Sequence, residues 1–219
     1  MPYQLLVFDW DGTLMDSQAH IVACFTSAMQ DLSVVPLPPE VIRKVIGLGL
    51  VEAVQALYPE QDVQFWEPLA KRYRHHFLYG NHPASDLFEG AKETLCQLKD
   101  QGYLLAIATG KSRDGLNHAL ASTGIGAWFD TSRCVGETRS KPHPEMLLQI
   151  MDELDVAPGQ TLMIGDTEYD LKMATHAQVD AVAVSYGMHD HEQLQACQPK
   201  VCLHHINELI PWLMQLKSQ

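Results

Sequence analysis

The sequence predicts a doubly wound α/β fold, in which helices cover a parallel sheet and a helical insertion follows the first strand. The first observation behind this prediction is that four short apolar runs alternate with segments of helical periodicity. Because strands joined through helices form right-handed crossovers, these strands should be parallel. The second observation is that residues 15–83 break the alternation and carry only helical patterns. We therefore expect a core of residues 1–14 and 84–219 and a small helical domain of residues 15–83.

The apolar runs have the length and aliphatic content of buried strands, and each ends at a polar or glycine-containing cluster. They span residues 4–8, 103–108, 161–164 and 181–184. The helices expected around the sheet span residues 91–99, 113–122 and 144–154. Proline and glycine separate the helices expected in the insertion, at residues 18–30, 39–45, 51–57 and 65–78.

Net charge argues against large anionic partners. Asp and Glu total 27 against 15 Lys and Arg, a formal net charge of −12. Such a field repels a phosphate backbone, so nucleic acid and anionic membrane surfaces are not expected as partners. A small anionic substrate remains compatible, because a metal ion, a lysine and helix N-termini can supply positive charge locally.

Cysteine usage and the N-terminal residues predict a cytoplasmic protein. The five cysteines are an odd number, widely scattered and without a Cys-x-x-Cys pair, which favours buried, reduced thiols. No basic leader precedes the first acidic residue, Asp9, so neither a signal peptide nor a transit peptide is expected. No apolar run approaches the roughly 20 residues that a membrane-spanning helix needs.

Two carboxylates follow the first predicted strand, in the string Asp9-Trp10-Asp11-Gly12-Thr13. Held on a turn that Gly12 permits, one side chain can face a metal ion and a substrate while the other takes a different task. The alternative is an ordinary acidic turn. In an open parallel sheet, chemistry lies beyond the carboxyl ends of the strands, which is where this string lies.

Candidate anion-binding groups follow the second predicted strand and precede a later helix. Thr109-Gly110-Lys111-Ser112 offers a hydroxyl and free N–H groups at a helix N-terminus, although a plain helix cap would look the same. Lys141-Pro142-His143-Pro144 places a lysine in a rigid, extended segment. Taken alone, a lysine such as Lys141 is usually a solvated surface charge.

The third predicted strand ends in Gly165-Asp166-Thr167-Glu168-Tyr169-Asp170. Asp166 lies at the strand end, and Asp170 follows four residues later, on the same face if a helix has begun. Acidic residues that favour a helix dipole are the alternative. All four strings lie at or beside strand ends, which predicts a single site.

In order and spacing, the four strings resemble the four motifs of the haloacid dehalogenase superfamily. Asp11 resembles the second acid of its phosphotransferase branch, which the dehalogenases lack. The insertion is similar to the small C1 cap of the phosphoglycolate phosphatase and β-phosphoglucomutase-like subfamily. Within it, residues 43–49 (RKVIGLG) look more like the phosphoglycolate phosphatase cap.

The resemblance implies an aspartyl-phosphate mechanism. Asp9 would be the nucleophile, and Asp11 would act as general acid and then as general base. A divalent ion, Mg²⁺ in view of the hard oxygen ligands, would bind the carboxylates of Asp9 and Asp166 and the backbone carbonyl of Asp11.

The same resemblance assigns supporting roles. Thr109 and the Gly110 N–H would hold the phosphoryl oxygens, and Lys141 would offset the negative charge. Asp170 would orient a metal-bound water or Lys141. In the insertion, Arg43 is the candidate for a substrate carboxylate, with a solvated helix charge as the alternative.

The expected function is therefore Mg²⁺-dependent hydrolysis of a small phosphate monoester, a phosphorylated metabolite for which 2-phosphoglycolate is the first choice. One alternative is a sugar phosphomutase of the β-phosphoglucomutase type, which shares the motifs. The other is a phospho-aspartate signalling module like a receiver domain, which lacks the helical insertion. The sequence does not set the oligomeric state.

Overall fold

A six-stranded parallel sheet forms the centre of the computed structural model, which describes residues 2–80 and 85–217. Within those residues the strand order is β5-β4-β1-β6-β7-β8, and every pairing is parallel. The strands are β1 (Leu5–Phe8), β4 (Leu104–Thr109), β5 (Thr131–Cys134), β6 (Thr161–Gly165), β7 (Asp180–Val184) and β8 (Val201–Leu203). The predicted doubly wound fold is confirmed.

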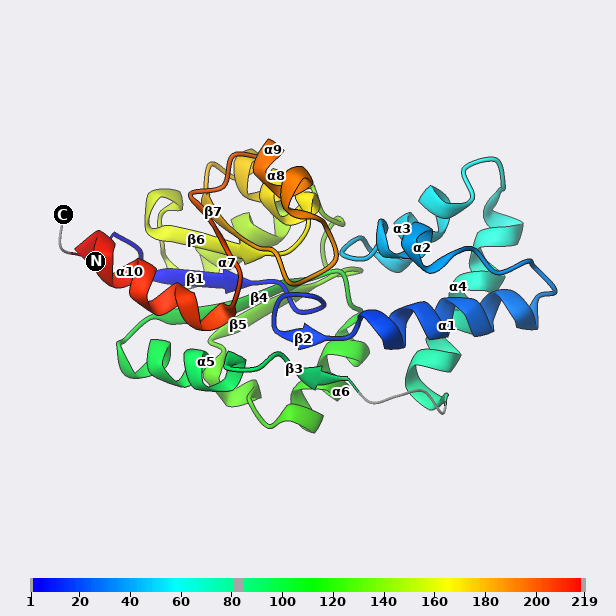
Figure 1. The fold of residues 1–219 in the computed structure, drawn as a ribbon, viewed down its shortest axis with the longest axis horizontal. Helices are drawn as coiled ribbons and strands as arrows, with labels where there is room; N and C mark the ends of the chain where they lie inside the picture. The colour runs from blue at the N-terminus through cyan, green and yellow to red at the C-terminus, as the bar shows by residue number, and fades with distance from the viewer. Residues whose placement is uncertain (1, 81–84, 218–219) are drawn as a thin grey trace.

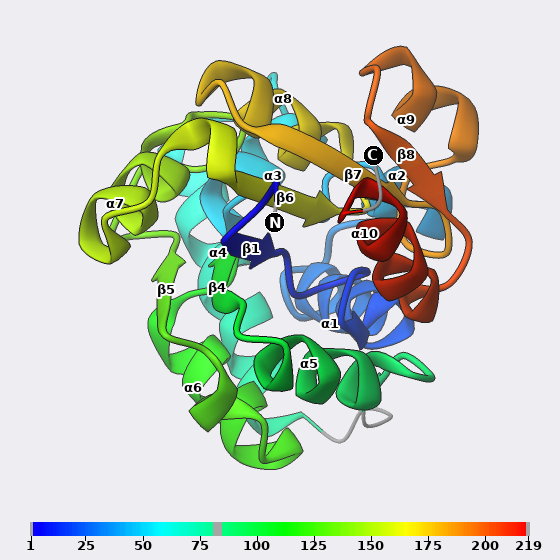
Figure 2. The same cartoon turned by 90° about the vertical axis from the view of Figure 1, so that its left-hand side faces the viewer.

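Helices cover both faces of the sheet because its side chains alternate between two buried clusters. In β1, Leu6 and Phe8 pack into one cluster and Leu5 and Val7 into the other. Figure 2 shows α5 and α10 on one side of the sheet and α7 and α8 on the other. The helices around the sheet are α5 (Ala91–Asp100), α6 (Arg113–Thr123), α7 (Glu145–Leu154), α8 (Glu168–His176), α9 (His191–Ala196) and α10 (Leu209–Lys217).

Both edge strands were absent from the sequence-based prediction. β5 reads TSRC and pairs only with β4, and β8 reads VCL and pairs only with β7. An edge strand needs little apolar content, because only part of its surface is buried. The four predicted strands are the four inner ones, which the burial of both faces makes continuously apolar.

The helical insertion consists of the four helices described between β2 (Met15–Asp16) and β3 (Asp86–Leu87). They are α1 (Gln18–Asp31), α2 (Pro39–Arg43), α3 (Leu50–Leu57) and α4 (Val63–Tyr79). Their apolar faces form a cluster separate from those of the sheet, and Figure 1 shows them beyond one end of the sheet.

A two-stranded antiparallel ribbon joins the chain entering the insertion to the chain leaving it. β2 (Met15–Asp16) pairs with β3 (Asp86–Leu87), and the Met15 side chain packs into a cluster of the sheet. The predicted boundary between residues 83 and 84 lies outside the described residues. Among the described helices, none combines the length and apolar character needed to cross a bilayer.

All five cysteines carry free thiols, as expected. The expectation that they are buried is correct only for Cys24 and Cys134. Cys96 is exposed, because it lies on the outer side of α5 while Leu95 and Leu98 face the sheet. Cys197 and Cys202 are partly exposed.

Candidate active site

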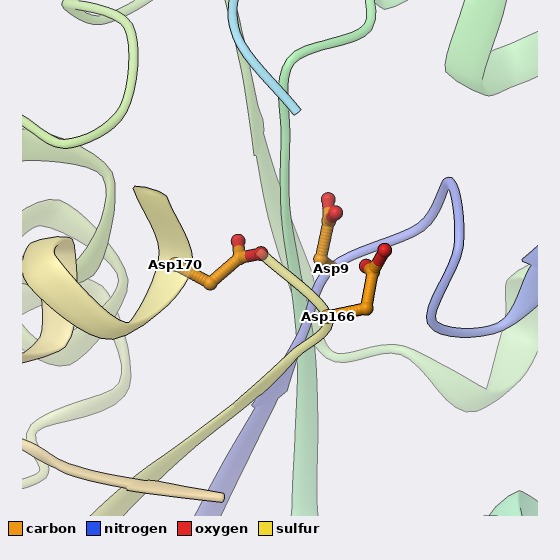
Figure 3. A group of neighbouring side chains, drawn as sticks. All are labelled: Asp9, Asp166 and Asp170. Carbon is orange, nitrogen blue, oxygen red and sulfur yellow. The ribbon is translucent and has the colours of Figure 1, made fainter. Parts of the chain in front are cut away.

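Three buried carboxylates meet at the carboxyl ends of neighbouring strands. Asp9 follows β1, Asp166 follows β6, and Asp170 lies in the first turn of α8. The register pairs Phe8 with Ile164, so the residues that follow these two strands emerge side by side. One carboxylate oxygen from each aspartate lies within 4.8 Å of the other two, and Figure 3 shows the Asp9 and Asp166 carboxylates next to each other.

Lys141 is the cation of this cluster. Its Nζ lies 2.6 Å from Asp9 Oδ1 and 2.6 Å from Asp170 Oδ1, and the side chain is fully buried. Burial opposes the charge on Lys141, but the Asp170 and Asp9 carboxylates outweigh it and raise the pKa of the ammonium above its ordinary value. The solvated-lysine alternative is therefore wrong.

Negative charge in the cluster exceeds positive charge. Burial raises the pKa of Asp9 well above its ordinary range against the opposing effect of Lys141, and the Asp170 and Asp166 charges raise it further. Asp9 Oδ2 is buried and has no hydrogen-bond partner among the described residues. An orphaned carboxylate oxygen beside a second carboxylate fits a hard divalent cation, so the residues present suit Mg²⁺.

Asp166 is held by hydrogen bonds to both oxygens. Thr13 donates from its hydroxyl to Oδ1 at 2.7 Å, and the Met188 N–H donates to Oδ2 at 2.8 Å. Gly12 has φ +87°, and its missing side chain leaves the space that the Asp166 carboxyl occupies. Burial, together with the charge of Asp170, raises the pKa of Asp166 to about 7.

Asp170 holds Lys141 and caps its own helix. Its Oδ2 accepts from the Thr167 N–H at 3.1 Å and from the Thr167 hydroxyl at 2.7 Å, while Oδ1 accepts from Lys141. The Asp170 N–H donates back to the Thr167 hydroxyl oxygen at 3.4 Å, and this bond forms the capping box of α8 together with the bond from the Thr167 N–H. Because both oxygens are already used, the geometry favours the predicted role of orienting Lys141.

Asp11 contacts two residues to which the sequence analysis gave no role. Ser17 donates its hydroxyl to Asp11 Oδ1 at 2.5 Å, and Lys111 Nζ lies 3.0 Å from Oδ2. The Lys111 ammonium also lies 4.3 Å from the centre of the Phe77 ring on α4. The adjacency of Lys111 to Thr109 and Gly110 was the only signal for it in the sequence.

The predicted anion-binding residues lie where the helical insertion meets the core. Thr109 is the buried last residue of β4, and its Oγ1 accepts from the Lys111 N–H at 3.2 Å. A side chain at Gly110 would place its Cβ 2.5 Å from the Leu48 carbonyl oxygen. Only glycine therefore permits this close approach of the insertion.

A cavity of about 550 Å³ lies between the helical insertion and the core. Of the predicted site residues, those that line it are Asp9, Asp11, Thr109 and Gly110. The cavity therefore connects the orphaned carboxylate of Asp9 to the surface of the insertion.

Arg43, the predicted substrate contact in the insertion, is not among the described residues that line the cavity. It is the last residue of α2 and is partly exposed. The neighbouring Lys44 carbonyl accepts from the Tyr169 hydroxyl at 2.9 Å, so the chain that follows α2 contacts α8.

Three relatives cover nearly the whole chain. The "Probable phosphatase IndB" of Dickeya dadantii is 35% identical over 94% of this chain and 91% of its own length. A phosphoglycolate phosphatase of Colwellia psychrerythraea is 31% identical over 94% of this chain and 95% of its own. The pyrophosphatase PpaX of Bacillus mycoides is 28% identical over 100% of both chains.

The family assignment comes from sequence and structure together. A haloacid dehalogenase-like hydrolase structure from Bacteroides fragilis superposes with a TM-score of 0.89 at 29% identity, covering 94% of this chain and 99% of that one. Residues 6–184 match the haloacid dehalogenase-like hydrolase family. The match begins in β1 and ends with β7, so it contains all four motifs. The chain belongs to the haloacid dehalogenase-like hydrolase family, as its motifs predict.

Proposed function

We propose that this chain is a divalent-cation-dependent phosphatase that hydrolyses a small phosphate monoester through an aspartyl-phosphate on Asp9. The observation that carries the proposal is the Asp9 carboxylate, which lies on the cavity with Oδ1 on Lys141 and Oδ2 without a partner. The names of the three relatives, all phosphatases or pyrophosphatases, support the same chemistry.

Mg²⁺ would be held by the carboxylates of Asp9 and Asp166 and by the backbone carbonyl of Asp11. The ion supplies positive charge that lets an anionic carboxylate approach a phosphate dianion. Thr13 and the Met188 N–H keep the Asp166 carboxylate turned toward Asp9.

In the first step, a carboxylate oxygen of Asp9 forms a bond to phosphorus while the bond to the alcohol oxygen breaks. The Thr109 hydroxyl and the Gly110 N–H would hold the transferring phosphoryl oxygens, and Lys141 would offset the charge shared by nucleophile and phosphate. Asp170 keeps Lys141 in place. This splits one difficult displacement into two easier ones.

Asp11 would protonate the leaving alkoxide and then accept a proton from the water that hydrolyses the aspartyl-phosphate. Its carboxylate lines the cavity, where Ser17 and Lys111 hold it. The two contacts fix its orientation before substrate arrives.

Replacing Asp11 with asparagine should slow hydrolysis of alkyl phosphates by about 10²- to 10⁴-fold, and of an activated aryl phosphate far less. Protonation matters most when the leaving oxygen is basic. Because the same carboxylate would serve as base in the second step, the variant should accumulate phospho-Asp9, measured by intact mass after acid quench. Equal slowing of both esters with no trapped intermediate would leave Asp11 only a structural role.

The relatives' names suggest 2-phosphoglycolate and pyrophosphate as the first two compounds to assay. The function is tested by phosphate release from a panel of phosphorylated metabolites in the presence of Mg²⁺. Conversion of a sugar phosphate to its isomer without free phosphate would replace the phosphatase by a phosphomutase.

Replacing Arg43 with alanine should leave KM for 2-phosphoglycolate and for p-nitrophenyl phosphate within about twofold of wild type. The reason is that Arg43 does not line the cavity. A rise in KM for 2-phosphoglycolate alone would instead assign Arg43 to the substrate carboxylate.

The free thiols also support a cytoplasmic location for the phosphatase. Reduced cysteines persist in a reducing compartment, and none of the five forms a disulfide.

A further inference from the structure

The cavity wall that faces Asp9 is apolar. It comes from α1, α4 and the loop before α3, and its members include Ile21, Phe25, Val45, Leu48, Tyr73 and Phe77. The ring centroids of Phe25 and Tyr73 lie 4.4 Å apart, and those of Tyr73 and Phe77 lie 5.9 Å apart. The insertion therefore presents the partly exposed rings of Tyr73 and Phe77 to the cavity, and the buried Phe25 ring packs against Tyr73.

Charged groups in the cavity are already paired or lie in solvent. Lys111, whose side chain is only 7% exposed, contacts Asp11 and the Phe77 ring. Among the described lining residues, the insertion adds only Glu52 and Arg74 as charged groups, and both are exposed. A second anionic group on the substrate would be repelled by Glu52, and solvent would screen its attraction to the exposed Arg74.

Arg139 is the third cation among the described residues that line the cavity, and it also has hydrogen-bond partners. Its Nη1 lies 3.0 Å from His143 Nε2, and its backbone N–H donates to Glu145 Oε2 at 2.8 Å. The side chain is exposed, on the core side of the cavity. No unpaired, buried cation thus lines the cavity within residues 2–80 and 85–217.

The volume agrees with the chemistry of the wall. Clefts of roughly 300–1,000 Å³ hold ligands of drug size, and this one is about 550 Å³. A two-carbon alcohol beside the phosphate would leave most of the apolar wall in contact with water.

Resting on the proposed function, we propose that the substrate's alcohol is bulky, uncharged and apolar, and that it binds the wall formed by the insertion. The phosphate would lie at Asp9 and Thr109, which line the same cavity. Burying each methylene of the alcohol against the wall should raise kcat/KM about fourfold. A carboxylate in the same place would have to lose its hydration without gaining a partner.

The test compares hexyl phosphate with 5-carboxypentyl phosphate. The two esters have the same chain length and a leaving oxygen of similar basicity, and they differ only at the far end. We expect kcat/KM to be higher for hexyl phosphate by about tenfold or more, and to rise from ethyl to butyl to hexyl phosphate. Equal values for the pair, or a preference for the carboxylate, would overturn the proposal.

A designed cation should reverse the preference. Val51 lines the cavity and is 42% exposed, so Val51→Lys should fold normally and place an ammonium at the wall. Val63, which is 53% exposed at the start of α4 and is not among the lining residues, gives the matched control Val63→Lys. Both esters carry the same phosphate, so the added lysine affects the binding of that phosphate equally in both. The ratio of the two kcat/KM values therefore reports only the effect on the far end of the chain.

Val51→Lys should move the ratio toward 5-carboxypentyl phosphate by about fivefold or more, while Val63→Lys leaves it at the wild-type value. An unchanged ratio in Val51→Lys, or the same shift in both variants, would overturn the proposal. Phosphate release from p-nitrophenyl phosphate by the wild type tests the phosphatase activity separately from the apolar pocket. If that ester is hydrolysed but chain length and charge have no effect, the apolar pocket fails and the phosphatase stands.

Discussion

Replacing Asp9 with asparagine is expected to lower kcat on the order of 10⁶-fold, the scale of loss when a covalent nucleophile is removed. An amide is too poor a nucleophile to attack phosphorus. The substitution is nearly isosteric, and burial already disfavours the charge on Asp9, so the folded state should keep its stability. Phosphate release and thermal unfolding of the same preparation measure the two effects.

The matched control for Asp9→Asn is Asp16→Asn. Asp16 is an exposed acid on β2, and its loss removes the same charge without touching the cluster. We expect its kcat to equal that of the wild type. Phosphate release by Asp9→Asn at the wild-type rate would show that Asp9 is not the nucleophile.

Removing divalent cations with EDTA should reduce turnover by about 10³-fold or more, because the Asp9 and phosphate charges then repel each other at close range. Adding Mg²⁺ back should restore it. Full turnover in chelator, with metal-free protein confirmed by elemental analysis, would contradict the proposed role of the ion.

The same cluster predicts how Mg²⁺ affinity depends on pH. In the metal-free protein, burial raises the pKa of Asp166 to about 7, so this carboxyl binds a proton below that pH. Proton and metal then compete, and the apparent Kd for Mg²⁺ should rise by up to about tenfold for each pH unit below 7. Titrations with Mg²⁺ at pH 6 and pH 8 measure this, and a Kd independent of pH would contradict it.

The four inner strands could be predicted from the sequence, because burial on both faces of the sheet makes each of them a continuous apolar run. β1, β4, β6 and β7 are all apolar runs that lie between neighbouring strands. β5 was not readable, because its polar TSRC sequence lies at a sheet edge where one neighbour suffices. Tertiary pairing, rather than local propensity, makes it a strand.

The buried site was readable for a topological reason. Parallel strands bring the residues after their carboxyl ends to one edge of the sheet. Asp9 and Asp166 therefore meet, although they lie 157 positions apart in the sequence. The Met188 N–H that holds Asp166 was not readable, since any residue has a backbone donor.

Contacts between the insertion and the core were not readable, because they depend on how two separately packed clusters meet. Arg43 looked suitable by charge, yet it is not among the described residues that line the cavity. Lys111 looked like part of a helix cap, yet it reaches Asp11 and Phe77. Which cations line the cavity depends on how the helical insertion is placed against the core.

Formation of an aspartyl-phosphate on Asp9 can be measured by mass spectrometry of the enzyme quenched in acid during turnover, followed by peptide mapping. We expect the mass of one phosphoryl group on the peptide that contains Asp9, and its absence in Asp9→Asn. A phosphoryl group on any other residue, or turnover with no phosphorylated enzyme at any quench time even in Asp11→Asn, would contradict it.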